Sequence, residues 1–354
     1  MAKRGPVKVL IIDDSALVRA LLSEILSGHE NIDVVGSASD PYDAREMIKQ
    51  LNPDVLTLDI EMPRMNGIAF LKNLMRLRPM PVVMISTLTQ QGAPATLEAL
   101  ELGAVDFVPK PKTEGAVALE KYSEEIIEKV LCAARANVAP RIEDKKAQTP
   151  DSAVATALTY GKTLKPGFLC AIGASTGGTE AIKDVVKSLP ANSPAVVIAQ
   201  HIPAVFSSSF AKRVDTLSAV HVYEAENNQK IEPGSVYIAP GDAHLRVIER
   251  QGSYICQLGT DDLINRHRPS VEALFDSVTK HVGDKAMGVI LTGMGADGAA
   301  ALLRMKQAGC VTVAQDEATS VVWGMPGAAV KLGAADQVLP LDKITRYILT
   351  RAYQ

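Results

Sequence analysis

The sequence predicts an α/β protein of two domains, each built on a mostly parallel sheet. The chain has 354 residues, a length that favours two domains over one. On both sides of its middle, apolar runs of strand length alternate with stretches whose apolar residues recur at helical spacing. The stretch between them has neither period. We therefore place a first domain at residues 1–137, a linker at 138–165 and a second domain at 166–354.

Composition narrows the class of protein. Hydrophobic residues make up 47% of the chain and aromatic residues only 4%, so we expect cores packed by aliphatic side chains. The net charge of −3 and the lack of a basic stripe argue against nucleic acid as a partner. The four cysteines are far apart and form no CxxC pair, which is typical of free thiols in a reducing compartment. With no signal segment and no apolar run of membrane-spanning length, we expect a cytoplasmic protein without membrane insertion.

The first domain begins with a buried strand at Val7–Ile12 and a helix at Ser15–Leu26. The helix is indicated by apolar residues at helical spacing, namely Leu17, Val18, Leu21, Leu22 and Ile25. Further apolar runs predict strands at Ile32–Gly36, Asp54–Leu58, Val82–Ile85 and Val105–Val108, and a last helix at about Ala116–Ala136. This alternation predicts a parallel sheet with helices on both faces.

Residues 138–165 contain Pro140, Pro150, the charged stretch Arg141–Lys146 and a run rich in Ala and Thr, and no strand or helix period persists there. We interpret this stretch as a linker between the domains. The alternative is a loosely packed surface loop.

The second domain is also α/β, with one antiparallel insertion. Two strand-like runs within Val236–Gln257 flank Gln251-Gly252-Ser253 and predict an antiparallel hairpin. The other strands are predicted at Phe168–Ile172, Ala195–Ala199, Met287–Thr292 and Val311–Ala314. Helices are predicted at Glu180–Leu189, from Pro269 onward, and at Ala299–Gln307. The pattern indicates a doubly wound, mostly parallel sheet.

Carboxylates gather at strand ends in the first domain. Asp13 and Asp14 end the first strand, and Asp59 ends the third. The carboxyl ends of parallel strands share one edge of a sheet, so these side chains are expected to meet there. Three carboxylates repel one another unless a cation joins them, and Mg²⁺ prefers such oxygen ligands. Asp59 is then placed to act as a nucleophile towards a phosphoryl group.

Two further strand ends support phosphoryl chemistry. Ser86 offers a hydroxyl at the end of the fourth strand, and Lys110, followed by Pro111, offers a positive charge at the end of the fifth. The alternative is that the aspartates are helix N-caps. That explanation suits Asp14 alone better than the whole ordered set.

These residues closely resemble the receiver domain of two-component response regulators. The resemblance covers roughly residues 7–130 and rests on Asp13-Asp14-Ser15, Leu58-Asp59-Ile60-Glu61-Met62-Pro63, Ser86 and Lys110-Pro111. It implies a flavodoxin-like (βα)5 fold and phosphorylation at Asp59. It also implies Mg²⁺ held by Asp14, Asp59 and the backbone carbonyl of Glu61, with Asp13 acting through water. Phe107 matches the switch aromatic of that family, and its alternative is a plain core residue.

The second domain carries a candidate nucleophile in a glycine-rich turn. Gly173-Ala-Ser175-Thr-Gly177 follows an apolar run and fits the nucleophile-elbow pattern G-x-S-x-G. A serine hydroxyl needs a base, and His201 comes directly after the apolar run Ala195–Gln200. Asp297, in another glycine-rich turn after a strand, is placed to orient the imidazole. Backbone N–H groups near Met294 are expected to hold an oxyanion.

Each of these residues also has a structural alternative. Ser175 and Asp297 are each suited to cap a helix, and His201 to be a hydrogen-bonded residue at a strand end. The same turn looks like a degraded dinucleotide fingerprint, but Ser175 replaces the middle glycine and no acid follows the next strand. Arg266-His267-Arg268 is a weak candidate for binding an acidic substrate segment, with Arg266 and Arg268 as the contacting residues and a solvated charge cluster as the alternative. The scattered histidines indicate no zinc site.

The second domain resembles the chemotaxis protein-glutamate methylesterase (CheB) family, in which a receiver domain precedes the esterase. The motifs that carry the resemblance are Gly173-Ala-Ser-Thr-Gly-Gly178, Gln200-His-Ile-Pro203, Tyr237-Ile-Ala-Pro-Gly-Asp242, Asn265-Arg-His-Arg-Pro-Ser270 and Leu291-Thr-Gly-Met-Gly-Ala-Asp-Gly298. The resemblance implies a catalytic triad of Ser175, His201 and Asp297. It implies helper roles for Thr176 and the backbone N–H of Met294, and no cofactor for the esterase reaction. One departure is Ala296, where relatives are expected to have Asn.

The resemblance implies a phosphorylation-activated serine hydrolase that demethylates glutamate γ-methyl esters, and deamidates glutamines, on chemoreceptors. Its expected partners are methyl-accepting chemoreceptors as substrates and the chemotaxis histidine kinase as phosphodonor. Two other classes stay open. One is a phosphorylation-controlled receptor-binding module whose catalytic set is inactive. The other is a DNA-binding regulator, which is disfavoured because the second domain lacks a helix-turn-helix pattern.

Overall fold

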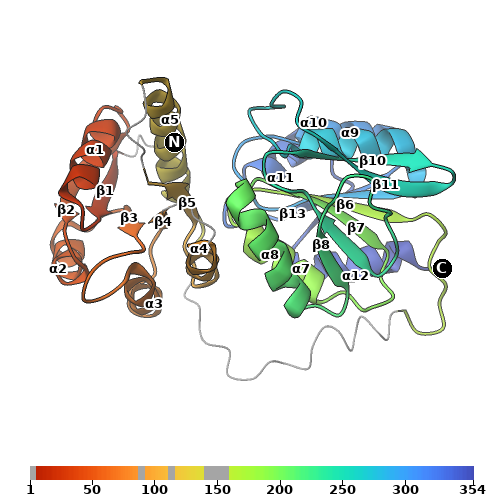
Figure 1. The fold of residues 1–354 in the computed structure, drawn as a ribbon, viewed down its shortest axis with the longest axis horizontal. Helices are drawn as coiled ribbons and strands as arrows, with labels where there is room; N and C mark the ends of the chain where they lie inside the picture. The colour runs from red at the N-terminus through yellow and green to blue at the C-terminus, as the bar shows by residue number, and fades with distance from the viewer. Residues whose placement is uncertain (1–4, 87–91, 111–115, 139–158) are drawn as a thin grey trace. The chain divides into compact units, whose positions relative to one another are not determined.

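The computed structural model of the protein describes residues 5–86, 92–110, 116–138 and 159–354. The chain divides into two compact units, Met1–Asp144 and Lys145–Gln354, called here the N-terminal and C-terminal units. Each unit contains its own sheet and helices (Figure 1).

The N-terminal unit is a five-stranded sheet in the order β2-β1-β3-β4-β5, and every neighbouring pair is parallel. This order is the flavodoxin-like arrangement, so that prediction is confirmed. The strands are β1 (Val7–Ile12), β2 (Ile32–Ala38), β3 (Val55–Asp59), β4 (Val82–Ser86) and β5 (Asp106–Pro109). The helices are α1 (Ala16–Ser27), α2 (Pro41–Leu51), α3 (Gly67–Leu77), α4 (Ala93–Glu101) and α5 (Ala116–Ala133).

Local sequence signals start the helices that follow the first three strands. The Ser15 hydroxyl accepts the N–H of Val18 at the start of α1. Asp40 caps α2, where Pro41 occupies the first turn and needs no backbone donor, and Asn66 caps α3. Each cap satisfies N–H groups that would otherwise lack a partner, so each helix begins directly after the loop at a strand end.

The C-terminal unit is a seven-stranded sheet in the order β14-β13-β12-β6-β7-β9-β8, in which all neighbouring pairs are parallel. Its strands are β6 (Leu169–Ala174), β7 (Ala195–Gln200), β8 (His221–Glu224), β9 (Ser235–Ile238), β12 (Ala286–Ile290), β13 (Val311–Gln315) and β14 (Gln337–Leu339). The central strands β6, β7 and β12 are buried along their whole length, as expected for a parallel sheet covered on both faces.

Helices cover both faces of this sheet, as Figure 1 shows. One group comprises α9 (Val271–His281), α10 (Ala299–Gln307) and α11 (Met325–Lys331), and the other comprises α7 (Gly178–Lys187), α8 (Ala204–Thr216) and α12 (Leu341–Ala352). A separate antiparallel hairpin pairs β10 (His244–Arg250) with β11 (Ser253–Gly259). The doubly wound arrangement with one antiparallel hairpin is therefore confirmed.

Several predicted helix bounds were wrong. The helix predicted at Glu180–Leu189 is α7, which spans Gly178–Lys187. The helix predicted from Pro269 begins at Val271, because the Ser270 hydroxyl accepts the N–H groups of Glu272 and Ala273 and so sets the start of α9. The last helix of the first domain ends at Ala133 rather than Ala136, and hydrogen-bonded turns follow it.

Most of the predicted linker, residues 139–158, lies outside the described residues. At its end, Thr163 and Gln354 exchange backbone hydrogen bonds, and Leu164 bridges to Tyr353. These residues are part of the C-terminal unit. Within the described residues, no helix has the length and apolar character needed to cross a bilayer.

Gly67, at the start of α3, has no room for a side chain. An added Cβ would lie 1.9 Å from the carbonyl oxygen of Asp59, a backbone atom that cannot move aside. We expect Gly67→Ala to destabilise the N-terminal unit by about 1–3 kcal/mol. Hydrogen exchange of the β3 amides in the full chain should accelerate accordingly. Gly28→Ala is the matched control, because its φ is −69° and its added Cβ meets atoms only at 3.4 Å. Unchanged β3 protection in Gly67→Ala would contradict this prediction.

Candidate functional site

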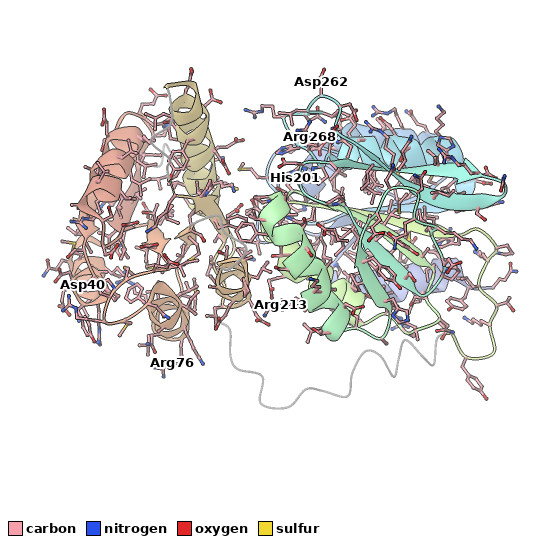
Figure 2. The ribbon with its side chains drawn as sticks, in the orientation of Figure 1. Asp40, Arg76, His201, Arg213, Asp262 and Arg268 are labelled. Carbon is pink, nitrogen blue, oxygen red and sulfur yellow. The ribbon has the colours of Figure 1, made fainter. Side chains whose placement is uncertain are left out.

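In the C-terminal unit, three adjacent strands present the predicted triad at their carboxyl ends. Ser175 follows β6, and His201 follows its neighbour β7, in which Gln200 pairs with Ala174. The His201 N–H donates to the Ala174 carbonyl at 3.1 Å. Asp297 lies beyond the end of β12, the neighbour of β6 on its other side. His201 and Arg268 are labelled in Figure 2.

The turn at Ser175 is a sharp connection from β6 to α7. The Ser175 carbonyl accepts hydrogen bonds from the Gly178 N–H at 2.7 Å and from Gln200 Nε2 at 2.9 Å. Gly177 has a φ of +75°, and a Cβ there would also lie 2.7 Å from that of Val321. No side chain caps α7, so the Ser175 hydroxyl does not serve as its N-cap.

His201 is held on one ring nitrogen. Its Nε2 lies 2.9 Å from Asp297 Oδ2, and because an ionised carboxylate only accepts, Nε2 is the donor. Nδ1 is buried and has no hydrogen-bond partner, so the hydroxyl of Ser175 does not bond to the ring in this structure. The Asp297 contact leaves Nδ1 as the basic atom of the ring.

Asp297 is the most heavily bonded side chain at this site. Besides His201, it accepts hydrogen bonds from four groups, namely Asn265 Nδ2 at 2.8 Å, Ser270 Oγ at 3.0 Å, the Val271 N–H at 2.7 Å and the Glu272 N–H at 3.3 Å. The last two open α9, so Asp297 does cap a helix. That helix is α9, however, and not α10, which follows Asp297 in the sequence.

These contacts decide the charge of Asp297. Burial raises the pKa of its carboxyl, but hydrogen bonds from His201, Asn265 and the Val271 N–H outweigh this effect and lower the pKa to about 2. Asp297 is therefore ionised at neutral pH and can stabilise a proton on His201.

A second glycine-rich turn lies against Ser175. The Ser175 N–H donates to the Thr292 carbonyl at 3.1 Å, and a Cβ on Gly293 would come within 2.8 Å of that of Ser175. Met294 is the next residue. The Thr292 hydroxyl donates to the Thr176 carbonyl at 3.0 Å, which ties the two turns together. The structure therefore brings Thr176 and Met294 to the serine turn.

Sequence reasoning missed the roles of two residues at this site. Asn265 bonds to Asp297, and the ring of His267 stacks on that of His201, with centroids 3.7 Å apart and planes 15° from parallel. Both lie in the Asn265–Ser270 motif, in which Asn265 was given no role and His267 was considered only as part of a cluster for binding an acidic segment. Arg266 is exposed, whereas Arg268 Nη1 donates to the carbonyls of Thr260 and Asp261 and so holds a loop.

In the N-terminal unit, the predicted acidic site is assembled. Asp13, Asp14 and Asp59 each offer an oxygen within 4.8 Å of the others. Asp13 and Asp59 are buried and Asp14 is exposed. Lys110 Nζ donates to Asp59 Oδ2 at 2.8 Å and lies 3.7 Å from Asp13 Oδ2.

This site fits a hard divalent cation. Asp13 Oδ2 is buried and has no hydrogen-bond partner, so an oxygen ligand stands ready beside two other carboxylates. The Glu61 N–H donates to Asp59 Oδ1 at 3.3 Å, which brings the Glu61 backbone next to the same carboxylate.

Burial also sets the protonation of the acidic site. It raises the pKa of Asp59 to about 6, and the nearby Asp13 charge adds to that rise, while Lys110 and the Glu61 N–H oppose it. The pKa of Asp13 is likewise raised by burial. The site carries more negative charge than its one lysine compensates, which favours binding of a cation.

The other residues predicted for the phosphoryl site and its switch lie in different surroundings. The hydroxyl of Ser86 shares a 2.8 Å hydrogen bond with that of buried Thr96. Phe107 is buried, and Lys129 Nζ lies 5.1 Å from the centre of its ring. Pro111 lies outside the described residues.

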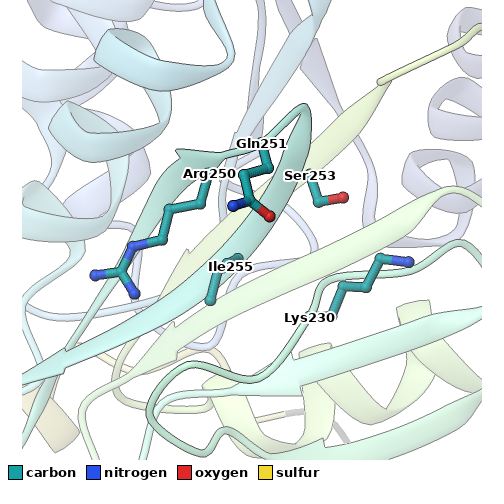
Figure 3. Close-up of a pocket in the computed structure, with 5 residues that line it drawn as sticks. All are labelled: Lys230, Arg250, Gln251, Ser253 and Ile255. Carbon is teal, nitrogen blue, oxygen red and sulfur yellow. The ribbon is translucent and has the colours of Figure 1, made fainter.

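A pocket elsewhere in the C-terminal unit contains none of these residues (Figure 3). It is lined by Lys230, Arg250, Gln251, Ser253 and Ile255, around the turn of the β10–β11 hairpin. The site residues Asn265 and His267 follow the opposite end of that hairpin.

Known proteins are similar to both units of the chain. Residues 170–348 match the family model of the CheB methylesterase, and residues 9–119 match that of the response regulator receiver domain. The chain is 65% identical to the protein-glutamate methylesterase/protein-glutamine glutaminase 2 of Saccharophagus degradans, over 98% of this chain and 99% of that protein. It is 54% identical to a protein of the same description, numbered 1, from Hahella chejuensis, over 95% and 94%.

A solved structure agrees with the C-terminal unit. The crystal structure of the Thermotoga maritima CheB methylesterase catalytic domain aligns with a TM-score of 0.51 and 39% identity. The alignment covers 52% of this chain and 98% of that domain.

The raised pKa of Asp59 predicts that replacing its carboxyl by a neutral group stabilises the N-terminal unit to an extent that depends on pH. Folding favours the protonated form, so this contribution is present below pH 3.8 and lost as pH rises through about 6. At pH 8 in EDTA, Asp59→Asn should therefore stabilise the N-terminal unit by on the order of 1–3 kcal/mol, and by little below pH 4. Thermal unfolding of the full chain across this pH range measures the effect.

Asp54→Asn is the control, because Asp54 is exposed and its side chain accepts a hydrogen bond from the Lys8 N–H. An Asp59→Asn variant that is no more stable than the wild type at pH 8 would contradict the expected charge burial.

Proposed function

Because the chain belongs to the CheB methylesterase family and carries a response regulator receiver domain, we propose that it is a phosphorylation-activated serine hydrolase. Its proposed reactions are demethylation of glutamate γ-methyl esters and deamidation of glutamines on chemoreceptors. One observation carries the proposal, namely an imidazole fixed by Asp297 whose Nδ1 is left without a partner beside the Ser175 turn.

The proposed chemistry follows from the positions of these groups. Ser175 Oγ attacks the ester carbonyl while its proton passes to His201 Nδ1, and the Asp297 carboxylate stabilises the imidazolium. The proton then moves to the leaving oxygen, methanol departs and a Ser175 acyl-enzyme remains. Water, activated by the same imidazole, releases the glutamate and restores the hydroxyl. With a glutamine side chain, ammonia is the leaving group.

The oxyanion formed during attack needs preorganised donors. We assign this role to Thr176 and the backbone N–H of Met294, because the hydrogen bonds of Thr292 hold both turns against Ser175. One such donor contributes about 10²–10³ in rate. The scheme uses only side chains, backbone groups and water, so we propose no cofactor for hydrolysis.

In the N-terminal unit we propose Asp59 as the phosphoryl acceptor. Asp14, Asp59 and the Glu61 carbonyl would hold Mg²⁺, with Asp13 acting through water. The metal would supply positive charge for the phosphoryl oxygens. Lys110 already bonds to Asp59 and would contact the phosphoryl group, and Ser86 would do so by turning its hydroxyl away from Thr96.

We further propose that the phosphodonor is the chemotaxis histidine kinase and that the protein acts in the cytoplasm on receptor segments, without nucleic acid or membrane insertion. Phosphorylation of Asp59 would relieve an inhibition of the C-terminal unit by the N-terminal unit. We keep Arg266 and Arg268 as weak candidates for contacting an acidic substrate segment, and the side chain of Arg266 is exposed.

The esterase proposal predicts the effect of removing the nucleophile. Ser175→Ala should lower methanol release from methylated receptor membranes by at least about 10³-fold, because no other group replaces the attacking oxygen. Receptor binding, measured by co-sedimentation, should persist. Ser253→Ala, in the hairpin of the same unit, is the control. Full methanol release by Ser175→Ala would instead place the nucleophile elsewhere. If the wild type released no methanol, the result would favour the receptor-binding module.

The receiver proposal predicts activation by a small phosphodonor. Acetyl phosphate with Mg²⁺ should raise methanol release by the full-length wild type, because phosphorylation of Asp59 would relieve the inhibition. Asp59→Asn should show no such rise, whereas Asp54→Asn should respond like the wild type. A wild type that carries a verified Asp59 phosphate but shows no rise would rule out the activation proposal.

A further inference from the structure

A second imidazole lies face to face with the ring of His201. The two ring centroids are 3.7 Å apart and their planes differ by 15°, so His267 covers one face of the base. The His201 side chain is only 9% exposed. The close stacking therefore limits how far the ring of His201 can tilt.

The hydrogen bonds of the His201 ring do not by themselves fix the orientation of its plane. The bond from Nε2 to Asp297 fixes one atom of the ring but leaves rotation about that contact. Nδ1 has no partner, so the nucleophile does not hold the ring either. Of these contacts, the stack with His267 is the one that restrains the ring plane.

His267 is itself held in place by a tight turn. Ile264 and His267 exchange backbone hydrogen bonds of 2.9 and 3.2 Å, and the two residues between them have positive φ values of 52° and 67°. This is the geometry of a type I′ turn, in which asparagine is favoured at the first central position. Asn265 occupies that position.

The same turn is anchored to the catalytic carboxylate. Asn265 Nδ2 donates to Asp297 Oδ1 at 2.8 Å and to Glu272 Oε2 at 2.6 Å. Arg304 of α10 donates to the other oxygen of Glu272 at 2.6 Å. The turn thus places Asn265 on Asp297 and His267 on His201. One hydrogen-bonded segment therefore contacts both the base and the carboxylate that orients it.

We propose that His267 is a positioning residue for the general base, which holds the plane of the His201 ring so that Nδ1 stays directed for proton transfer. The inference rests on the proposed hydrolase function. His267 acts through His201 and needs no contact with substrate. It requires a flat ring at position 267, and the ability of His267 to carry a proton is not part of the role.

The test compares a flat and a branched side chain at position 267. Full-length His267→Leu and His267→Phe, each activated with acetyl phosphate and Mg²⁺, are assayed for methanol release from methylated receptor membranes. We expect His267→Leu to lower kcat by about 10- to 100-fold with little change in KM, because misdirection of the base slows the chemical step. His267→Phe should recover most of the lost kcat, because the phenyl ring restores the stack. His221→Leu, at an exposed histidine of β8, is the control.

A second measurement keeps the two proposals separable. The rate at which phenylmethylsulfonyl fluoride modifies Ser175, followed by mass spectrometry, depends on the base but requires no receptor. It should fall in His267→Leu and recover in His267→Phe. If His267→Leu does not fold, His267→Asn takes its place in both assays. Full kcat without an aromatic ring, or no recovery with phenylalanine, overturns the positioning role. A different outcome is a wild type that releases no methanol while the rates of Ser175 modification still follow the expected order of wild type, His267→Phe and His267→Leu. That result overturns the proposed receptor substrate and leaves the positioning role standing.

Discussion

The buried carboxylate of Asp297 is the interaction on which the candidate active site depends. An ionised carboxylate removed from water is costly unless it is fully bonded, and Asp297 accepts from a ring nitrogen, an amide, a hydroxyl and the first turn of α9. These donors lie in two segments, and each is 25 to 96 positions from Asp297 in the sequence. Satisfying this one charge therefore fixes the base, the start of a helix and the Ile264–His267 turn relative to one another.

The two sites of the chain use buried carboxylates in opposite ways. At Asp297, the hydrogen bonds outweigh the effect of burial, so the pKa falls to about 2 and the carboxylate is ionised at neutral pH. At Asp59, the effect of burial outweighs the hydrogen bonds, so the pKa rises to about 6. An added positive group would stabilise the ionised carboxylate. The first arrangement suits a preorganised catalyst, whose charges should not rearrange during reaction. The second suits a switch, because a ligand that supplies the missing charge changes the energy of the site.

Much of this organisation could be read from the sequence. Small residues and polar side chains placed directly after apolar runs predicted Ser175, His201 and Asp297, and likewise Asp13, Asp59 and Lys110, because parallel strands end at a common edge. Helix bounds were less accurate where a cap decided them, as with Ser270 and α9. The family and fold expected from the motifs are confirmed by the comparisons with known proteins.

By itself, then, the sequence determined which elements form and which residues stand at their ends, because periodicity, caps and turns are local properties of the chain. Only the tertiary structure decided that Asp297 caps α9 rather than α10, that Asn265 reaches this carboxylate and that His267 stacks on His201. It also decided that Ser86 bonds to Thr96. These contacts join residues 10 to 66 positions apart, and a partner at such separation is chosen by packing, which no local pattern encodes.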